Sequence, residues 1–269
     1  MLTIERVDPE SQAQTLRFVE FPYRLFATCP QWVPPLFTSA LQLFDRETHP
    51  LYEHSHAAFF LAVRYGFDVG RIAVYALAYE GVTEANFSLF DCINDIEVAT
   101  ALFERAFEWA RQRGMKKIIG PRGFTLLDGN GILIKGFEYP PLIESMTYNY
   151  PYYISLIEAN GFEKEGDHSS YTTSTVGHPP PWLHQIADRI VQKEGLHIKR
   201  FASMEELLPW GPRFLETFKK AMTQNSKCTF SFTTPKPRET SNENFKSPNF
   251  HKYPRLQHPP LGGGPISIP

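Results

Sequence analysis

The stretch NFSLFDCINDIEVATALFERAFEWARQRGMKKII, residues 86–119, decides the fold of this chain. Residues 86–93 are apolar and aromatic and are bounded by polar residues, which predicts a buried strand. Apolar residues then recur at steps of three and four over residues 96–110, as they do on one face of a helix. Gly114 ends this helix, and residues 116–119 begin a second strand. The stretch therefore predicts a strand–helix–strand unit.

The turn between the first strand and the helix carries unusual chemistry. A helix N-terminus fed by a strand is where many α/β enzymes hold a phosphate. Here the turn carries Asp91, Asp95 and Glu97, and it contains no glycine. Asn94 and Glu97 have the spacing of a capping box, through which a chain satisfies its own first helical N–H groups. The turn thus indicates a phosphate site and also an obstacle to phosphate binding.

The elements before this unit predict further strands and helices. Residues 2–7 read as a strand, and Ser11 can cap a following helix that Pro22 would kink or divide. Residues 36–44 are amphipathic. Two apolar runs, residues 59–65 and 71–79, are separated by a glycine-bounded loop over residues 66–70, which predicts a hairpin.

The elements after the unit become less regular. Residues 121–147 form a long excursion rich in Gly and Pro. Pro151 and Gly161 then bracket a predicted helix over 152–160, and residues 164–173 close with a strand-like run. The chain beyond the Pro180–Pro181 linker predicts a helix over 182–194, a strand over 196–201 and a helix capped by Ser203 and Glu206 that reaches Met222. The strand and helix at 2–26 resemble those at 196–222, a weak internal repeat.

The predicted domain organisation has three parts. Residues 1–175 form one α/β domain, and residues 176–225 form a linker and the beginning of a second half. Residues 226–269 show no period of 2 or 3.6, contain many prolines and predict disorder. This tail is either natural or the product of a truncated or frame-shifted gene, and we favour the second interpretation.

Composition excludes several classes of protein. The net charge is −2, so no global field attracts nucleic acid or an anionic membrane. The three cysteines are far apart and form no CxxC pattern, which argues against a disulfide framework and a cysteine metal site. No signal sequence and no apolar run of membrane-spanning length is present. We expect a cytoplasmic protein without nucleic-acid or membrane partners, and the sequence leaves its oligomeric state open.

Several local motifs resemble the GNAT (acyl-CoA N-acyltransferase) superfamily. ALFERAFEWARQRGMKKI at 101–118 is similar to the helix and strand after the GNAT pyrophosphate loop, and PYYISLIEANGFEKEGD at 151–167 resembles the late GNAT helix. More narrowly, residues 2 to about 225 resemble the bacterial YghO-type group of GNAT-like proteins. The stretches that carry this resemblance are WVPPL (32–36), FDCIND (90–95), GPRGFTLLDGNGILIKGFEYPP (120–141) and YNYPYY (148–153).

The resemblance implies a GNAT-like fold, α/β (α+β), with a mixed, mainly antiparallel central sheet flanked by helices. Members of the group carry two GNAT-like halves, so residues 196–222 would begin a second half. The resemblance also implies acetyl-CoA or another acyl-CoA as cofactor and a small amine as substrate.

The pyrophosphate loop of GNAT proteins is Gln or Arg, two residues, Gly, one residue, then Gly or Ala. In this alignment Asn94 takes the first position, Glu97 replaces the first Gly and Ala99 fits the last. A carboxylate beside a diphosphate repels it, so the loop is degenerate. The set of residues expected to contact the cofactor is Cys92, Ile93, Asn94, Glu97, Val98 and Ala99.

The late helix also departs from the family pattern. GNAT enzymes often place a tyrosine general acid where this chain has Ile157. The resemblance implies that a thioester carbonyl bonds to the strand backbone around residues 91–93 and that a base removes the amine proton. Asp91 and Glu53 are the candidate bases.

Other polar and aromatic groups have two interpretations each. Glu53, His54 and His56 could form a metal or base site, but an ordinary polar loop is favoured because no third metal ligand is identifiable, and we expect no metal. Asp128 begins a Gly-rich segment that reads equally as a turn and as a substrate-facing loop. The candidate substrate contacts are Arg122, Asp128, Tyr148, Asn149 and Tyr152, with helix packing or a surface ion pair as the alternatives.

Two hypotheses of different class follow. The first is an acyl-CoA-dependent N-acyltransferase that acts on a small amine. The second is a catalytically inactive GNAT-fold module that binds a ligand or partner through residues 121–153. The turn over residues 94–99 discriminates between them, because only the first hypothesis needs it to hold a diphosphate.

Overall fold

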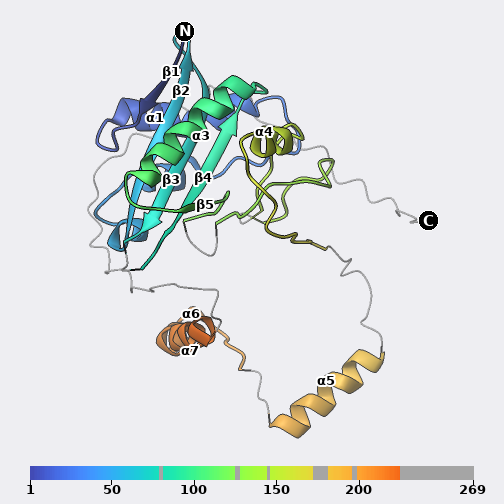
Figure 1. Cartoon of the computed structure of the whole chain (residues 1–269). Coiled ribbons are helices and arrows are strands. Elements are labelled where there is room, and N and C mark those ends of the chain that lie inside the picture. Colours follow the sequence, from blue (N-terminus) through green and yellow to red (C-terminus); the bar gives the residue numbers. More distant parts are fainter. Residues whose placement is uncertain (79–80, 125–127, 144–145, 172–180, 196–198, 225–269) are drawn as a thin grey trace, which may run out of the picture. The chain divides into compact units, whose positions relative to one another are not determined.

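A five-stranded sheet forms the centre of the protein (Figure 1). The computed structural model describes residues 1–78, 81–124, 128–143, 146–171, 181–195 and 199–224. The strands run in the spatial order β1-β2-β3-β4-β5. Neighbouring strands are antiparallel except β4 and β5, which are parallel, and this confirms the predicted mixed, mainly antiparallel sheet. The bounds are β1 Leu2–Arg6, β2 Ser55–Arg64, β3 Phe67–Leu77, β4 Glu84–Cys92 and β5 Lys117–Ile119.

The helices flank this sheet or follow it in the chain. The predicted crossover helix is present and connects β4 to the parallel strand β5 (Figure 1). The helical elements are α1 Gln12–Leu25, α2 Phe37–Gln42, the 3-10 helix η1 Pro50–Glu53, α3 Ile96–Arg111, α4 Tyr153–Ala159, α5 Pro181–Glu194, α6 Met204–Leu207, the 3-10 helix η2 Leu208–Trp210 and α7 Gly211–Gln224.

Some predicted elements differ from the structure. The strand predicted over 164–173 is wrong for residues 164–171, which form no strand and are exposed, since charged and polar residues make up most of this run. Part of the strand predicted over 196–201 and the whole predicted tail, 226–269, lie outside the described residues. The predicted division of the chain into three parts therefore stays a prediction.

The core has two layers, one on each face of the sheet. One layer packs α3 and α4 against the sheet through side chains such as Phe87, Phe103 and Tyr153. The other layer packs α1 against the opposite face through Phe18 and Phe59. Because helices cover both faces, β2 and β3 read as nearly continuous apolar runs rather than alternating ones.

The hairpin between β2 and β3 turns more tightly than the sequence indicated. Tyr65 and Gly66 have φ values of 53° and 80°, so these two residues alone make the turn. The predicted loop over 66–70 is therefore wrong, because β3 already begins at Phe67. Gly70 serves a different purpose, since a Cβ there would lie 2.8 Å from Cδ1 of Leu102 on α3.

A bulge in β4 changes which face its side chains occupy. Leu89 has a positive φ of 47°, and the β3–β4 register shifts between Arg71 and Ala73. Before the bulge Phe87 faces the α3 layer, and after it the even-numbered residues Phe90 and Cys92 face the same layer. The extra residue therefore turns Asp91 toward the other face, opposite Arg71.

Arg71 joins this carboxylate to α1. Its Nε donates to Oδ2 of Asp91 at 2.8 Å, and its guanidinium is nearly buried. The terminal nitrogen Nη1 of Arg71 donates to the carbonyl of Phe18 at 2.9 Å. That carbonyl lacks its usual helical donor because Pro22, four residues later, has no N–H. The helix continues past Pro22 to Leu25, so of the two predicted effects, a kink or a division, Pro22 does not divide the helix.

We predict that Arg71→Met destabilises the fold by about 3–5 kcal/mol, because it leaves Asp91 buried without a counter-charge. The double variant Arg71→Met/Asp91→Leu should recover most of this loss, since it removes both charges. Urea denaturation measures both changes in the free energy of unfolding. A double variant less stable than Arg71→Met would contradict this account.

Candidate functional site at the end of β4

The edge of β4 that faces β5 is only partly paired with another strand. β4 pairs with β5 only over residues 84–86, and one further bond joins Arg122 N to the carbonyl of Phe87 at 2.8 Å. Further along β4, the backbone of Cys92 forms hydrogen bonds with tyrosine hydroxyl groups at the start of α4 rather than with a neighbouring strand. The hydroxyl of Tyr152 donates to the Cys92 carbonyl at 2.8 Å, and Cys92 N donates to the hydroxyl oxygen of Tyr153 at 3.3 Å.

Tyr153 connects this edge to the buried ion pair. Its hydroxyl donates to Oδ1 of Asp91 at 3.2 Å, while Arg71 holds the other carboxylate oxygen. Burial raises the pKa of Tyr153 well above its ordinary value, and burial raises that of Tyr152 as well. Both hydroxyls therefore keep their protons at neutral pH. Asp91 is already engaged by three donors, which leaves it a poor candidate for a free base.

Cys92 contributes its backbone rather than its thiol. Its side chain is fully buried, and its Sγ contacts the carbonyl of Asp95 at 3.9 Å. Burial raises the pKa of the Cys92 thiol above its ordinary value, with a further contribution from Asp95. The thiol therefore stays protonated and is not a nucleophile.

The turn into α3 is capped by the chain itself, one residue later than predicted. Asp95 is the N-cap, and its Oδ1 accepts from Glu97 N at 2.9 Å and from Val98 N at 3.4 Å. The predicted capping box of Asn94 and Glu97 is thus wrong, and Asn94 is exposed before the cap. The first N–H groups of α3, which would attract a phosphate, already have an acceptor.

Arg64 at the end of β2 binds both acidic residues of this turn. It donates to Oδ2 of Asp95 at 2.6 Å and to Oε2 of Glu97 at 2.7 Å. The hydrogen bond from Arg64 holds the pKa of Asp95 below its ordinary value. The cation that could attract a diphosphate here is therefore shared between two carboxylates.

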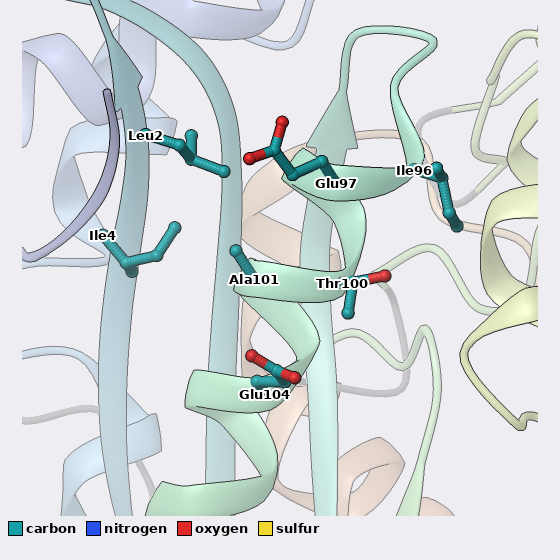
Figure 2. A pocket seen from close by; sticks show the side chains of 7 residues that line it. All are labelled: Leu2, Ile4, Ile96, Glu97, Thr100, Ala101 and Glu104. Atoms are coloured by element: carbon teal, nitrogen blue, oxygen red, sulfur yellow. The ribbon is translucent and has the colours of Figure 1, made fainter.

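A shallow groove continues from this turn along α3. It measures about 360 Å³ and lies between β1 and α3 (Figure 2). Leu2 and Ile4 line it from β1, and the carboxylates of Glu97 and Glu104 line it from α3. An anionic group bound at the turn would meet the carboxylate of Glu97 first.

The structure brings together only some of the predicted site residues. Asp91, Cys92 and Tyr152 meet at the end of β4. Ile93 follows them, with its N–H donating to the Val69 carbonyl on β3 at 3.1 Å. The backbones of Val98 and Ala99 belong to the first turn of α3, whereas their side chains are fully buried in the core.

Glu53, the second candidate base, lies at the other end of the sheet. It precedes β2, whose first residue pairs with Leu77, whereas Asp91 pairs with Arg71. These two positions on β3 are six residues apart, or roughly 20 Å at ~3.3 Å per residue. The two candidate bases therefore do not share a site.

The long excursion after β5 holds the other candidates in local structure. Arg122 pairs with the exposed Glu165 at 3.2 Å. Asn130 donates to the Asp128 carbonyl and accepts from Gly123 N, each at 3.2 Å. These bonds close a turn around Asp128, which favours the turn interpretation of this segment over the substrate-facing one.

The aromatic segment before α4 is packed rather than open. Asn149 is buried, and its amide oxygen accepts from Leu133 N at 2.7 Å while its nitrogen donates to the carbonyls of Leu133 and Tyr150. All its hydrogen-bonding groups are thus used. The hydroxyl of Tyr148 donates to the Phe137 carbonyl at 3.0 Å. Among the predicted tyrosine contacts, Tyr152 is the one that reaches β4.

Within the described ranges, no group of three potential His, Cys, Asp or Glu ligands is placed to bind a metal ion. No helix in these same ranges combines the length and the apolar character needed to span a bilayer.

Sequence reasoning missed three partners of this site: Arg64, Arg71 and Tyr153. Arg71 carried a usable signal, because an arginine inside an apolar strand needs a buried counter-charge. Tyr153 is the last residue of the YNYPYY motif (148–153), but it was not assigned to the site. Nothing in the sequence pairs Arg64 with a turn about thirty residues later.

We predict that Tyr153→Phe destabilises the fold more than Tyr152→Phe. The first change removes a buried partner of both Asp91 and Cys92 and should cost about 1–3 kcal/mol. The second removes one bond at a half-buried site that water can enter, at about 0.5–1.5 kcal/mol. Urea denaturation of the two matched variants measures the order, and an equal or reversed order would contradict it.

We predict that the stabilising effect of Asp95 depends on pH. Its folded-state pKa lies below the unfolded value of about 3.9, so its charge stabilises the fold above that value. The effect disappears as pH falls through the folded-state pKa. Asp95→Asn keeps a capping side chain but no charge. The difference in the free energy of unfolding between the unmodified protein and Asp95→Asn should narrow between about pH 5 and pH 3. A difference that stays constant with pH would contradict the role of Arg64.

Comparison with known proteins gives sequence relatives and more distant structural neighbours. No protein-family model matches the chain. It is 31% identical over 189 residues to a bacterial ceramide synthase of Caulobacter vibrioides, covering 68% of this chain and 48% of that protein. It is 30% identical over 202 residues to protein YghO of Escherichia coli, covering 71% of this chain and 50% of that protein. The chain thus spans about half the length of the curated relatives it matches.

Similar solved structures include an aminoglycoside acetyltransferase from an uncultured soil sample, at 11% identity and a TM-score of 0.40, covering 64% of this chain and 97% of that one. Another is a tandem GNAT protein from the clavulanic acid pathway, at 13% identity and a TM-score of 0.42, covering 60% and 43%. The two sequence relatives bear out the resemblance to the YghO type that the motifs indicated, over about half the length of each relative.

Proposed function

We propose that this chain contributes to acyl transfer from acyl-CoA to an amine, with the acyl group received at the end of β4. The observation that carries the proposal is the engagement of the Cys92 backbone by two tyrosine hydroxyls. A ligand can replace a hydroxyl group as hydrogen-bond partner of a strand edge more easily than it can replace a paired strand. The N–H and carbonyl of Cys92 can therefore accept a thioester or amide group in place of Tyr153 and Tyr152.

The residues present fit the two ends of acyl-CoA unequally. At the acyl end, the Cys92 N–H is a fixed donor that a thioester carbonyl can use. At the diphosphate end, the Asp95 cap occupies the N–H groups of Glu97 and Val98. We therefore infer weak cofactor binding, with the acyl end contributing more than the diphosphate end.

When bound, acyl-CoA supplies an activated acyl carbon. The residues of this chain supply position and proton control around it. The hydroxyl of Tyr152 is a protonated donor next to the strand edge. Arg71 holds the carboxylate of Asp91 through Nε and a terminal nitrogen, which keeps the strand end in place when the Tyr153 hydroxyl is exchanged. Asp91 is thus a positioning residue in this proposal.

The sequence relatives support N-acyl transfer as the reaction class. One relative is named a ceramide synthase, and a ceramide is the amide of a fatty acid with an amino alcohol. The chain spans only about half of that relative. An amine as the substrate of this chain is therefore part of our proposal.

The second candidate function is a binding module that no longer uses CoA. The observation that favours it is the closed turn into α3, where Asp95 satisfies the helix N–H groups and Glu97 adds negative charge. The two functions differ in whether the chain binds acyl-CoA at all, so calorimetry discriminates between them.

We predict that Glu97→Gln raises the affinity for CoA by several-fold and at most about tenfold. It removes a negative charge beside the expected diphosphate position, worth about 1 kcal/mol at an exposed site. It also releases Arg64 from one of its two carboxylates. Isothermal titration calorimetry with acetyl-CoA and a long-chain acyl-CoA measures the change.

The matched control is Glu104→Gln, which removes the same charge about two turns further along α3 in the same groove. This variant should leave the affinity nearly unchanged. Micromolar binding of acetyl-CoA by the unmodified protein would contradict the inferred weak diphosphate contact. Absence of binding in the unmodified protein and in Glu97→Gln would reject acyl transfer in favour of the binding module.

A further inference from the structure

A second pocket lies at the opposite end of α3 from the capped turn. It measures about 300 Å³, and its walls are mainly polar. It forms where β1 ends, β2 begins and the chain leaves α3. The lining residues are Arg6, Arg46, Tyr52, Ser55, His56, Ala57 and Arg113.

The lining carries three guanidinium groups and no carboxylate. Within the described part of the chain, Arg6, Arg46 and Arg113 make no salt bridge, although most other arginines near the sheet do. Three positive charges thus converge on one pocket in a chain whose net charge is −2. The three arginines are exposed, so water and salt screen their mutual repulsion in part, and an anion between them would offset what remains.

The electrostatics show that two of these groups affect each other. Burial lowers the pKa of Arg113, and the positive charge of Arg6 lowers it further. These residues come from β1 and from the segment after α3, so the fold rather than a local run of sequence brings them together. An anion placed between them would turn this repulsion into attraction for both.

Aromatic rings hold two of the guanidinium groups in place. Arg113 lies over the ring of Trp109 at 4.0 Å, and its guanidinium donates to the Trp109 carbonyl at 3.3 Å. Arg46 lies over the ring of Tyr52 at 5.6 Å, and the Tyr52 hydroxyl donates to the Leu43 carbonyl at 2.8 Å. Stacked guanidinium groups lose less freedom when they bind a ligand, which favours a specific site over a diffuse basic surface.

We propose that this pocket binds a small phosphorylated molecule, with its phosphate held by Arg6, Arg46 and Arg113. Guanidinium groups bind phosphate oxygens through pairs of N–H donors. Carboxylates accept the same pairs of hydrogen bonds, but a carboxylate carries less negative charge than a phosphate. His56 adds a further donor at the rim, and Tyr52 and Ala57 offer an apolar surface to a small organic group. The volume suits a phosphate with a few attached carbon atoms.

This site is separate from the proposed acyl-transfer site. The capped turn lies at the N-terminal end of α3, whereas Arg113 follows its C-terminal end. The helix contains 16 residues, which separates the two ends by about 24 Å at ~1.5 Å per residue. Loss of anion binding and loss of acyl-CoA binding can therefore be measured independently.

The test is calorimetric titration of the full chain with inorganic phosphate, inorganic pyrophosphate and glycerol phosphate, with sodium chloride at matched ionic strength as the reference. We expect saturable binding of pyrophosphate and glycerol phosphate. Arg6→Gln and Arg113→Gln should each weaken binding at least about tenfold. Arg113→Lys should keep part of the affinity, since it keeps the charge but loses the planar fork.

The control is Arg111→Gln, an exposed arginine on the last turn of the same helix that does not line the pocket. It should bind the anions as the unmodified protein does. Melting curves in chloride alone should show that all variants fold. The proposal is overturned if the anions act no more strongly than matched chloride, or if all variants bind the anions equally.

Discussion

The guanidinium group of Arg71 is the interaction on which the rest of the domain depends. It joins the carbonyl that Pro22 leaves free in α1 to the carboxylate of Asp91 in β4. Asp91 in turn accepts from Tyr153 of α4, whose hydroxyl oxygen accepts from the N–H of Cys92. One buried network thus fixes two helices and the end of the central strand. The distances between these elements follow from the geometry of this network.

The network also explains why the domain has a chemically distinct strand end. The bulge at Leu89 turns Asp91 toward Arg71 and leaves Cys92 on the α3 side. The short pairing of β4 with β5 exposes the edge at Cys92 to side chains rather than to another strand. The neighbouring helix N-terminus has its own cap in Asp95. A strand end covered by two tyrosine hydroxyls therefore lies beside a helix N-terminus closed by its own cap.

The sequence predicted the large elements because their signals are periodic. The apolar steps in α3, the apolar runs of β2 and β3, and the Pro and Gly around α4 each indicated the observed element. The bulge was not predictable, because apolar residues occur at both odd and even positions of residues 87–92, so neither alternation was favoured. The strand predicted over 164–173 failed for residues 164–171 since no paired, buried surface supports it there.

Predicting the site required knowledge of side-chain contacts that no pattern in the sequence indicates. Asn94 and Asp95 are both good N-caps, and the spacing to Glu97 favoured the wrong one. Asn149 was polar and aromatic-flanked like a ligand contact, yet its amide closes a loop. The three arginines of the second pocket are more than a hundred residues apart at their extremes. Side-chain partners across the sheet were therefore beyond reach, whereas the strand that leads into the turn was predicted.

The most direct test of the central claim is the NMR signal of the Cys92 amide. The chain has three cysteines, so labelling cysteine with ¹⁵N gives few signals, and the amide of Cys29, which donates to Phe26, is an internal control. On titration with a long-chain acyl-CoA, the account predicts that the Cys92 signal moves while the Cys29 signal stays. An unchanged Cys92 signal at concentrations where calorimetry shows saturation would contradict it.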